Sequence, residues 1–376
     1  MGLAEFRVLL VMHWLSLKIN RGCSEVYVTI DMTVKSSILA AAFFAAAPGL
    51  VLVACSSSNS SPANATTGGN GNAAGGSSSS GGTSSTGTMI TAKSDEVGRF
   101  SVTLFEASTA SGNTVPAYTY VSGVIRDGVT PLGYTTAQVA QDGTCTLYSI
   151  SVPSCTGIAG GCGTGVCVAT DTCKALPTAK NAGTVTITGV GTSAISMVNI
   201  SNNYQYGGDI AYPGFAEGDT ITLSSGGADY AAFTVSAKGI APLKLSTDTY
   251  NLSKTSPLNL AWTAAGSLSD ARILVNLNLS HHAGSTGLLS CDVADTGSLT
   301  ISASLISQLI NLGVAGFPTL TVTRTSLGWV SITPGSVAFD VSSPISRTVT
   351  VDGYVSCTSN ADCTSGTCNT EMKLCE

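Results

Sequence analysis

Short segments in which apolar and polar residues alternate fill the chain from Val97 onward, and this pattern restricts the fold more than any other feature. A period of two places every second side chain on one face of a strand, whereas a helix needs a period near 3.6. Gly, Asn, Asp and Pro separate the segments, as turns between strands require. The clearest early segments are residues 100–105, 117–125, 184–188, 220–223 and 232–236.

A second set of such segments follows a joint at residues 239–242, Gly-Ile-Ala-Pro. About seven short strands in about 115 residues resemble an immunoglobulin-like sandwich. Trp262 is then expected in the core, on the second of these strands. The segments are residues 243–245, 257–263, 271–279, 288–293, 320–323, 337–341 and 347–351.

One segment has helical spacing instead. In residues 302–311, the apolar positions Leu305, Ile306, Leu309 and Ile310 follow the pattern i, i+1, i+4, i+5, which describes one face of a short helix. Gly313 is expected to end this helix. We expect the helix to close one end of a sandwich.

The fold class predicted from these patterns is all-β, with two antiparallel, immunoglobulin-like β-sandwich domains and one short helix. The first domain is expected at residues 94–240, with a cysteine-rich insert at 145–173. The second domain is expected at 241–356, followed by a cysteine-rich tail at 357–376.

The N-terminal region predicts export. A lysine, Lys35, precedes an apolar stretch at residues 36–54, which ends in Leu52-Val53-Ala54-Cys55. A charged start, an apolar centre and a small residue before the cut are typical of a secretory signal. The last four residues resemble the lipobox of bacterial lipoproteins. This resemblance implies that residues 32–54 are removed and that Cys55 is diacylated, which anchors the chain in a membrane. The alternative is a transmembrane anchor, but a polar segment follows Cys55 where stop-transfer charges would be needed.

The regions on either side of the signal complete this interpretation. Residues 1–31 contain Glu25 and Asp31, which are unfavourable ahead of an export signal, so we expect Met32 to be the true start and residues 1–31 to be an upstream extension. Residues 55–93 are expected to be a disordered tether, because 56–92 contain no charge and are almost entirely Ser, Gly, Thr, Asn and Ala. Ser56 stands where an aspartate marks inner-membrane retention in some lipoproteins. The resemblance to cell-surface lipoproteins of Gram-negative bacteria therefore implies the outer membrane.

Cysteines provide the only internal repeat. Two quartets both contain C-x-x-G-x-C, and a further two cysteines, Cys145 and Cys291, lie outside them. In an exported chain such an even number predicts disulfides. The pairing within each quartet stays open, and Cys291 can pair with Cys145 or with Cys357. Zinc is the rival interpretation, but neither quartet has a nearby histidine. The quartets are Cys155, Cys162, Cys167 and Cys173, and Cys357, Cys363, Cys368 and Cys375.

Charge and motif content exclude several functions. The formal charge of −6 and the absence of a Lys/Arg cluster argue against a nucleic-acid partner. The chain contains no G-x-S-x-G and no H-E-x-x-H motif, so we expect no enzyme. After the signal, histidine occurs only at His281 and His282, which we expect in a loop; a metal interpretation would recruit Asp292 or Asp295.

Acidic turn residues leave one cofactor alternative. Glu217, Asp219 and Asp229 lie in glycine-containing turns and could supply oxygen ligands to Ca²⁺. No complete D-x-D-x-D-G ligand series is present, so turn formation is the preferred interpretation. We therefore expect no cofactor, with Ca²⁺ as the alternative.

The remaining candidate is a binding surface. Four aromatic residues lie in loop-like sequence, where exposed rings could stack on sugars; in the alternative they pack inside the sandwich and their hydroxyls form hydrogen bonds. We expect a non-catalytic binding or adhesion protein whose partner is a polysaccharide or another surface protein. A structural or assembly role in the cell envelope is the alternative, and a hydrolase is the third hypothesis. The four residues are Tyr204, Tyr206, Tyr212 and Phe215.

Overall fold

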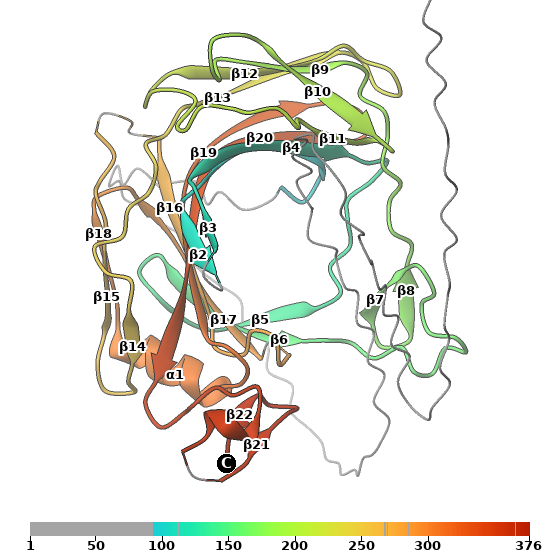
Figure 1. The fold of residues 1–376 in the computed structure, drawn as a ribbon. Helices are drawn as coiled ribbons and strands as arrows, with labels where there is room; N and C mark the ends of the chain where they lie inside the picture. Colours follow the sequence, from blue (N-terminus) through green and yellow to red (C-terminus); the bar gives the residue numbers. More distant parts are fainter. Residues whose placement is uncertain (1–92, 111–112, 267, 269, 285, 365) are drawn as a thin grey trace, which may run out of the picture. The chain divides into compact units, whose positions relative to one another are not determined.

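The computed structural model describes residues 93–376 apart from 111–112, 267, 269, 285 and 365 (Figure 1). These residues fold mainly into β-strands, with one α-helix, α1 (Ala303–Leu312), and one short 3-10 helix, η1 (Asn360–Asp362). The expected all-β fold class with a single short α-helix is confirmed. Neither helix of the described ranges is long and apolar enough to cross a membrane.

Most strands join in one continuous ladder. The alternating segments of the sequence supply many of these strands. Residues 99–105, 233–238 and 272–278 bury alternate side chains as the period-two pattern predicts, whereas residues 135–142 are mostly exposed. The order is β13 (Phe233–Lys238), β12 (Thr220–Ser225), β9 (Val185–Thr188), β10 (Ile195–Ile200), β11 (Asn203–Gln205), β4 (Tyr118–Ile125), β1 (Glu96–Phe105), β20 (Ser336–Val351), β19 (Thr319–Ser331), β16 (Arg272–Asn278), β17 (Gly287–Ala294), β6 (Cys145–Ser151) and β5 (Thr135–Asp142).

Two pairings differ from the antiparallel arrangement that the sequence predicted. β1 runs parallel to β20, and so does β14 (Tyr250–Leu252). Parallel neighbours need a long connection, and both strands are far from β20 in the chain. Four two-stranded sheets complete the fold: β2 (Ser108–Ala110) with β3 (Asn113–Val115), β7 (Val166–Ala169) with β8 (Thr172–Lys174), β15 (Leu258–Ala261) with β18 (Ser298–Ile301), and β21 (Cys368–Asn369) with β22 (Leu374–Cys375).

β10 changes partner at its middle and so creates a second layer. Ile195 to Met197 pair with β9, whereas Val198 to Ile200 pair with β11. Figure 1 shows β9, β12 and β13 stacked over β4, β20 and β19. A hydrophobic cluster that includes Phe100, Val121, Ile187 and Phe339 fills the space between these layers, and we call it the β1 cluster.

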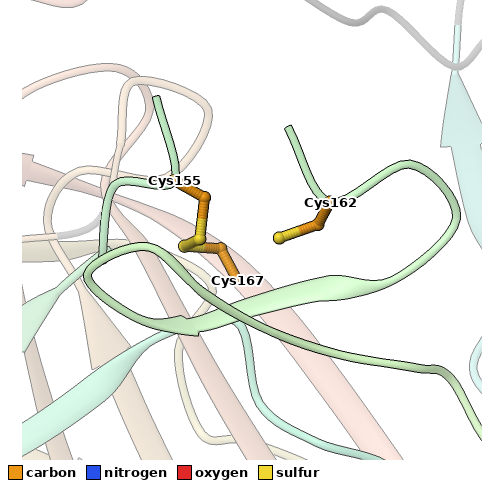
Figure 2. Close-up of side chains that lie close together, drawn as sticks. All are labelled: Cys155, Cys162 and Cys167. Carbon is orange, nitrogen blue, oxygen red and sulfur yellow. A yellow bond between two sulfur atoms is a disulfide. The ribbon is translucent and has the colours of Figure 1, made fainter. Parts of the chain in front are cut away.

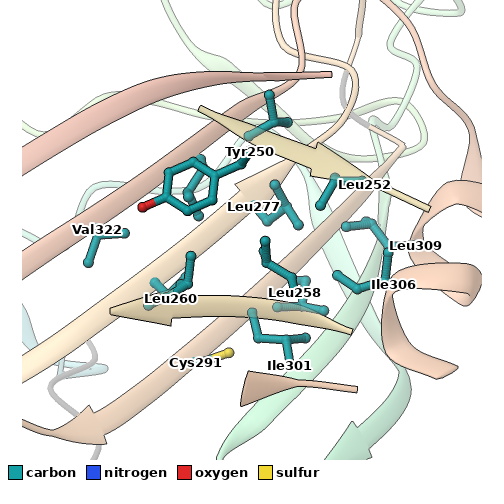
Figure 3. Packing of buried hydrophobic residues seen from close by; sticks show 14 of the residues in the cluster. Tyr250, Leu252, Leu258, Leu260, Leu277, Cys291, Ile301, Ile306, Leu309 and Val322 are labelled. Carbon is teal, nitrogen blue, oxygen red and sulfur yellow. The ribbon is translucent and has the colours of Figure 1, made fainter. Parts of the chain in front are cut away.

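A second hydrophobic cluster, the helix cluster, lies where α1, β14 and β15 cover β16 and β17. Figure 3 shows Leu258 and Leu260 of β15 facing Leu277 of β16, with Ile306 and Leu309 contributed by α1.

The helix has the predicted buried face, Leu305, Ile306, Leu309 and Ile310. It begins after Ser302, whose Oγ accepts a hydrogen bond from the Leu305 N–H, and it ends at Gly313.

The hairpin of β19 and β20 belongs to both clusters. Ser336–Ser342 of β20 pair with β1, whereas Thr319–Thr325 of β19 pair with β16. β6 comes from the region expected to form the first domain, yet it pairs with β17 in the helix cluster. The membership of the two clusters therefore differs from the expected domains at 94–240 and 241–356, because strands distant in sequence pair across residue 240.

A buried ion pair lies between the two clusters, beside the predicted joint at 239–242. Arg324 Nε–H donates to Asp295 Oδ2 at 2.6 Å, and Nη1–H donates to the Ala241 carbonyl at 3.0 Å. Trp262 Nε1–H donates to Asp295 Oδ1 at 2.7 Å. Trp262 is a core residue, as expected, and the guanidinium attaches the joint segment to β19. A charge buried in this way is tolerated because its donors are satisfied.

All ten cysteines of the described region form disulfides. Cys145 pairs with Cys291, which joins β6 to β17 and selects one of the pairings that the sequence left open. In both quartets the first cysteine pairs with the third and the second with the fourth. The third and fourth cysteines also face each other across a short hairpin in each quartet, at Cys167 and Cys173 and at Cys368 and Cys375. The sequence repeat is therefore also a structural repeat.

Candidate functional site

The structure places the predicted aromatic residues in or against the β1 cluster. Tyr204 has an exposed fraction of 1% and packs on Phe100, with ring centroids 5.7 Å apart. Phe215 is also buried, and Tyr206 and Tyr212 pack partly buried against the same cluster. This corrects the interpretation of Tyr204 and Phe215 as exposed binding residues. The sequence around Tyr204 forms strand β11 rather than a loop.

Tyr204 is held by a network of polar partners. Its hydroxyl donates to Asn181 Oδ1 at 2.9 Å and accepts from the Ala182 N–H at 2.8 Å and from Asn199 Nδ2 at 3.0 Å. A buried phenol needs such partners. Tyr204 therefore has the alternative role that the sequence analysis considered, that of a core residue with a bonded hydroxyl.

Two other tyrosines lie on the opposite face of the same sheet. Tyr118 and Tyr120 of β4 have exposed fractions of 41% and 38%, whereas their neighbours Thr119 and Val121 are buried. The parity of the strand explains this difference, since residues two apart share a face. Tyr118 stacks on Phe105 of β1, with ring centroids 5.0 Å apart.

Hydroxyl-bearing residues surround these tyrosines, and we call the whole set the tyrosine face. The strand registers place Thr103 opposite Tyr120, Ser101 opposite Ser122, and Ser342 opposite Thr103. The Thr103 and Ser342 hydroxyls are 3.5 Å apart. The tyrosine face consists of Arg99, Ser101, Thr103 and Phe105 on β1 and Tyr118, Tyr120 and Ser122 on β4, together with Asp340 and Ser342 of β20, which are buried.

The charges on the tyrosine face are compensated. Arg99 contacts Glu96 at 2.7 Å and Asp340 at 3.5 Å, and the Ser101 hydroxyl donates to Asp340 at 2.6 Å. Burial alone would lower the pKa of Arg99, but the hydrogen bonds and charges of Glu96 and Asp340 outweigh it and raise that pKa. The guanidinium thus stays charged and paired, so the face offers no unpaired charge to a ligand within the described residues.

The histidine pair lies in the turn after β16, as predicted. The rings of His281 and His282 have centroids 3.8 Å apart, and the backbone of His282 is in the left-handed region, with φ of 68°. Burial and the neighbouring His282 lower the pKa of His281. Neither ring makes a hydrogen bond to another described residue. Neither histidine is hydrogen-bonded to a described side chain that could act as a nucleophile.

The acidic residues considered for a metal already have protein partners. Asp295 binds Arg324, and Asp292 accepts a hydrogen bond from Arg272 Nε–H at 2.8 Å. Among the turn residues, Asp219 accepts from the Ala216 N–H at 2.7 Å and Asp229 from the Asn181 N–H at 2.8 Å. Glu217 accepts from the Leu268 N–H at 3.3 Å. Only the Asp219 bond stabilises its own turn, whereas the Asp229 and Glu217 bonds join segments that are distant in sequence.

The two cysteine quartets bring sulfur atoms close together in the way a metal site would. Cys155, Cys162 and Cys167 form one such group, shown in Figure 2, and the tail contains a second. Each of these cysteines is part of a disulfide, and the thiolate is the form that binds a metal. The quartets therefore act as cross-links in this structure. Cys55, the predicted lipidation site, lies outside the described residues.

A cavity of about 400 Å³ lies at the tip of the β19–β20 hairpin. Tyr230, Phe233, Val330 and Ile332 contribute to its lining. The Tyr230 hydroxyl donates to the Arg126 carbonyl at 2.9 Å, and burial raises the pKa of this phenol. The Tyr230 hydroxyl and the Asp229 carboxylate at the cavity are thus already hydrogen-bonded within the protein. The tyrosine face, which presents two half-exposed rings, is the stronger candidate site.

Comparisons with known proteins add little to this geometry. The chain matches no protein-family model and no curated protein. Among solved structures it is similar to the crystal structure of the chicken CNTN1 FN1-FN3 domains, at 8% identity over 62% of this chain and 72% of that chain, with a TM-score of 0.17. A TM-score this low carries no argument. The strand pairing and the disulfides themselves define the class, a disulfide-linked all-β protein with an exposed tyrosine face.

Proposed function

We propose that this protein is an exported, lipid-anchored, non-catalytic binding protein and that its tyrosine face binds a neutral polysaccharide. The observation that carries the proposal is the pair of half-exposed tyrosines, Tyr118 and Tyr120, on one face beside a row of Ser and Thr hydroxyls. Residues two apart on a strand are about 6.8 Å apart, so one extended ligand can contact both rings.

The chemistry of the face matches that of a sugar chain. Aromatic rings carry a negative face that attracts the weakly positive C–H groups of a sugar ring, and they bury much apolar area. Serine and threonine hydroxyls both donate and accept hydrogen bonds, as sugar hydroxyls require. The paired state of Arg99 and Asp340 favours an uncharged ligand over an acidic one.

Export is supported by the cysteines. Ten cysteines are paired in five disulfides, and disulfides persist in oxidising compartments outside the cytoplasm. The lipobox-like Leu52–Cys55 sequence and the uncharged residues 56–92 support a lipid anchor followed by a tether, with the outer membrane as the proposed location. A Cys55→Ala variant is expected to lose incorporation of labelled fatty acid, and retained labelling would contradict the anchor.

Binding can be tested on the full chain purified in detergent. We expect it to bind one or more of dextran, soluble starch, galactomannan and xyloglucan more tightly than polygalacturonate, which is the acidic comparator. Tyr120→Ala should weaken this binding while the fold is retained. Tyr354→Ala is the matched control, because Tyr354 has an exposed fraction of 39% but lies just after β20 and is not part of the tyrosine face. Equal loss in both variants, or no binding by the folded wild type, would contradict the proposal.

A further inference from the structure

The two ends of the main ladder differ in how they are covered. At one end, β13 packs against β19, where the Lys238 N–H donates to Ser326 Oγ at 3.1 Å. The approach is so close that a Cβ at Gly328 would overlap the Ser236 carbonyl oxygen. At the other end, β5 pairs with β6 on one side only, and no described strand pairs with its second side. β5 therefore presents backbone N–H and C=O groups at a free edge.

β5 has few of the features that usually protect a free edge. Natural edge strands carry lysine, proline, inward charges or bulges that prevent pairing with another chain. β5 has the sequence Thr-Thr-Ala-Gln-Val-Ala-Gln-Asp, so its only charge is Asp142 at the end, and it contains no Lys and no Pro. One bulge occurs, between Gln138 and Ala140. The stretch from Thr135 to Gln138 pairs regularly with β6 and stays available at its outer side.

Exposed apolar side chains gather beside this edge. Leu132 and Tyr134 lie just before β5, Val139 lies on it, and Val152 follows β6. Because Thr135 is opposite Ser151, Tyr134 and Val152 both adjoin the last residue pair of the β5–β6 hairpin. Burial of apolar surface is favourable, so a partner on this edge gains apolar contact area as well as backbone hydrogen bonds.

We propose that the β5 edge pairs in antiparallel orientation with the β5 edge of a second copy of this chain. An antiparallel pair of identical strands around a two-fold axis satisfies the same donors and acceptors on both sides. With full overlap, Thr135 of one copy lies opposite Asp142 of the other, so the two carboxylates are at opposite ends of the pair. The chain has a formal charge of −6, and this edge is a place where two copies meet without like charges directly opposed.

The test is the oligomeric state of the full chain in detergent, measured by sedimentation velocity across a wide range of protein concentration and without polysaccharide. We expect the wild type to form a reversible dimer and Val139→Lys to lose it, because a lysine on an edge strand opposes pairing with another chain. Val198→Lys is the matched control. Val198 is exposed to 55% against 44% for Val139, but it lies on β10, which already pairs with β9 and β11.

Each outcome decides the proposal. A dimer that is lost in Val139→Lys and retained in Val198→Lys, with equal free energies of unfolding for the two variants, supports it. A wild type that is monomeric at every concentration overturns it. A dimer that persists in Val139→Lys also overturns it, because the contact would then lie on another surface. Loss of the dimer in both variants overturns it as well, since the effect would not belong to the edge.

Discussion

Tyr204 and Tyr120 lie on adjacent strands of one sheet, yet they have opposite environments. Tyr204 of β11 is opposite Gly123 of β4 and faces the β1 cluster, with an exposed fraction of 1%. Tyr120 lies three residues before Gly123 on β4, on the other face, and remains half exposed. Whether an aromatic residue packs in the core or is exposed on the surface therefore depends on which face of the strand its position occupies.

Gly123 makes this arrangement possible. A Cβ at this position would overlap the ring of Phe100, and Phe100 is the residue against which Tyr204 packs. The glycine thus leaves room for two large rings on the core face of β4. Tyr118 and Tyr120 lie on the other face of β4, outside the core.

Replacing the buried Tyr204 with alanine should have the largest effect on stability. The substitution removes a buried ring and leaves the Ala182 N–H without its hydroxyl partner. We expect a loss of about 3–5 kcal/mol in the free energy of unfolding, as for other large-to-small core substitutions. Guanidinium titration of the full chain measures it, and a loss as small as that of an exposed tyrosine would contradict the core assignment.

Gly123→Ala should have the next largest effect. The added methyl group must displace Phe100, and overpacking of this kind costs about 1–3 kcal/mol. Ser122→Ala on the tyrosine face is the matched control, expected to change stability by about 0.5 kcal/mol or less. Thermal unfolding of the two variants compares the core face of β4 with its tyrosine face. Equal changes in stability would contradict the assignment of Gly123 to the core face.

Tyr204→Phe separates packing from hydrogen bonding. The ring stays, but the Ala182 N–H and the Asn181 and Asn199 side chains lose their bonds to the hydroxyl. A buried group left without its partner costs about 1–3 kcal/mol, so we expect a smaller loss than for Tyr204→Ala. If denaturant unfolding showed no loss at all, the network would not stabilise the core.

Tyr118→Ala should have the smallest effect on stability. The ring stacks on Phe105, and an aromatic pair of this kind contributes about 0.5–1.5 kcal/mol. Exposure on both sides of the pair favours the lower end of that range. A free energy of unfolding reduced by as much as in Tyr204→Ala would show that Tyr118 is a structural residue and not part of a binding surface.

The strand pattern and the helix could be predicted from local sequence, because alternation and helical spacing are properties of short segments. The fusion of residues 337–341 and 347–351 into the single strand β20 could not, since Pro344 lies between them. On one side of β20, the pairing with β1 ends at Ser342 and the pairing with β14 starts at Val349. Pro344 lies between these two pairings, so its missing N–H removes no hydrogen bond on that side. Such tolerance depends on tertiary pairing.

The candidate site was only partly accessible to sequence reasoning. Tyr118 and Tyr120 both belong to the predicted strand 117–125, and their spacing already places them on one face opposite Val121. The choice of Tyr204 failed because a short strand between turns, β11, has the same composition as a loop. The Cys145–Cys291 pairing likewise depends on β6 joining β17, a long-range contact that spacing does not show.

We propose that the tyrosine face binds a ligand without contributing much to the core. The dissociation constant of the best-bound neutral polysaccharide tests this proposal, measured for wild type, Tyr120→Ala and Tyr354→Ala at equal folded fractions. We predict an affinity at least about tenfold lower in Tyr120→Ala, equivalent to about 1.4 kcal/mol, and wild-type affinity in Tyr354→Ala. Unchanged affinity in Tyr120→Ala would contradict the proposal.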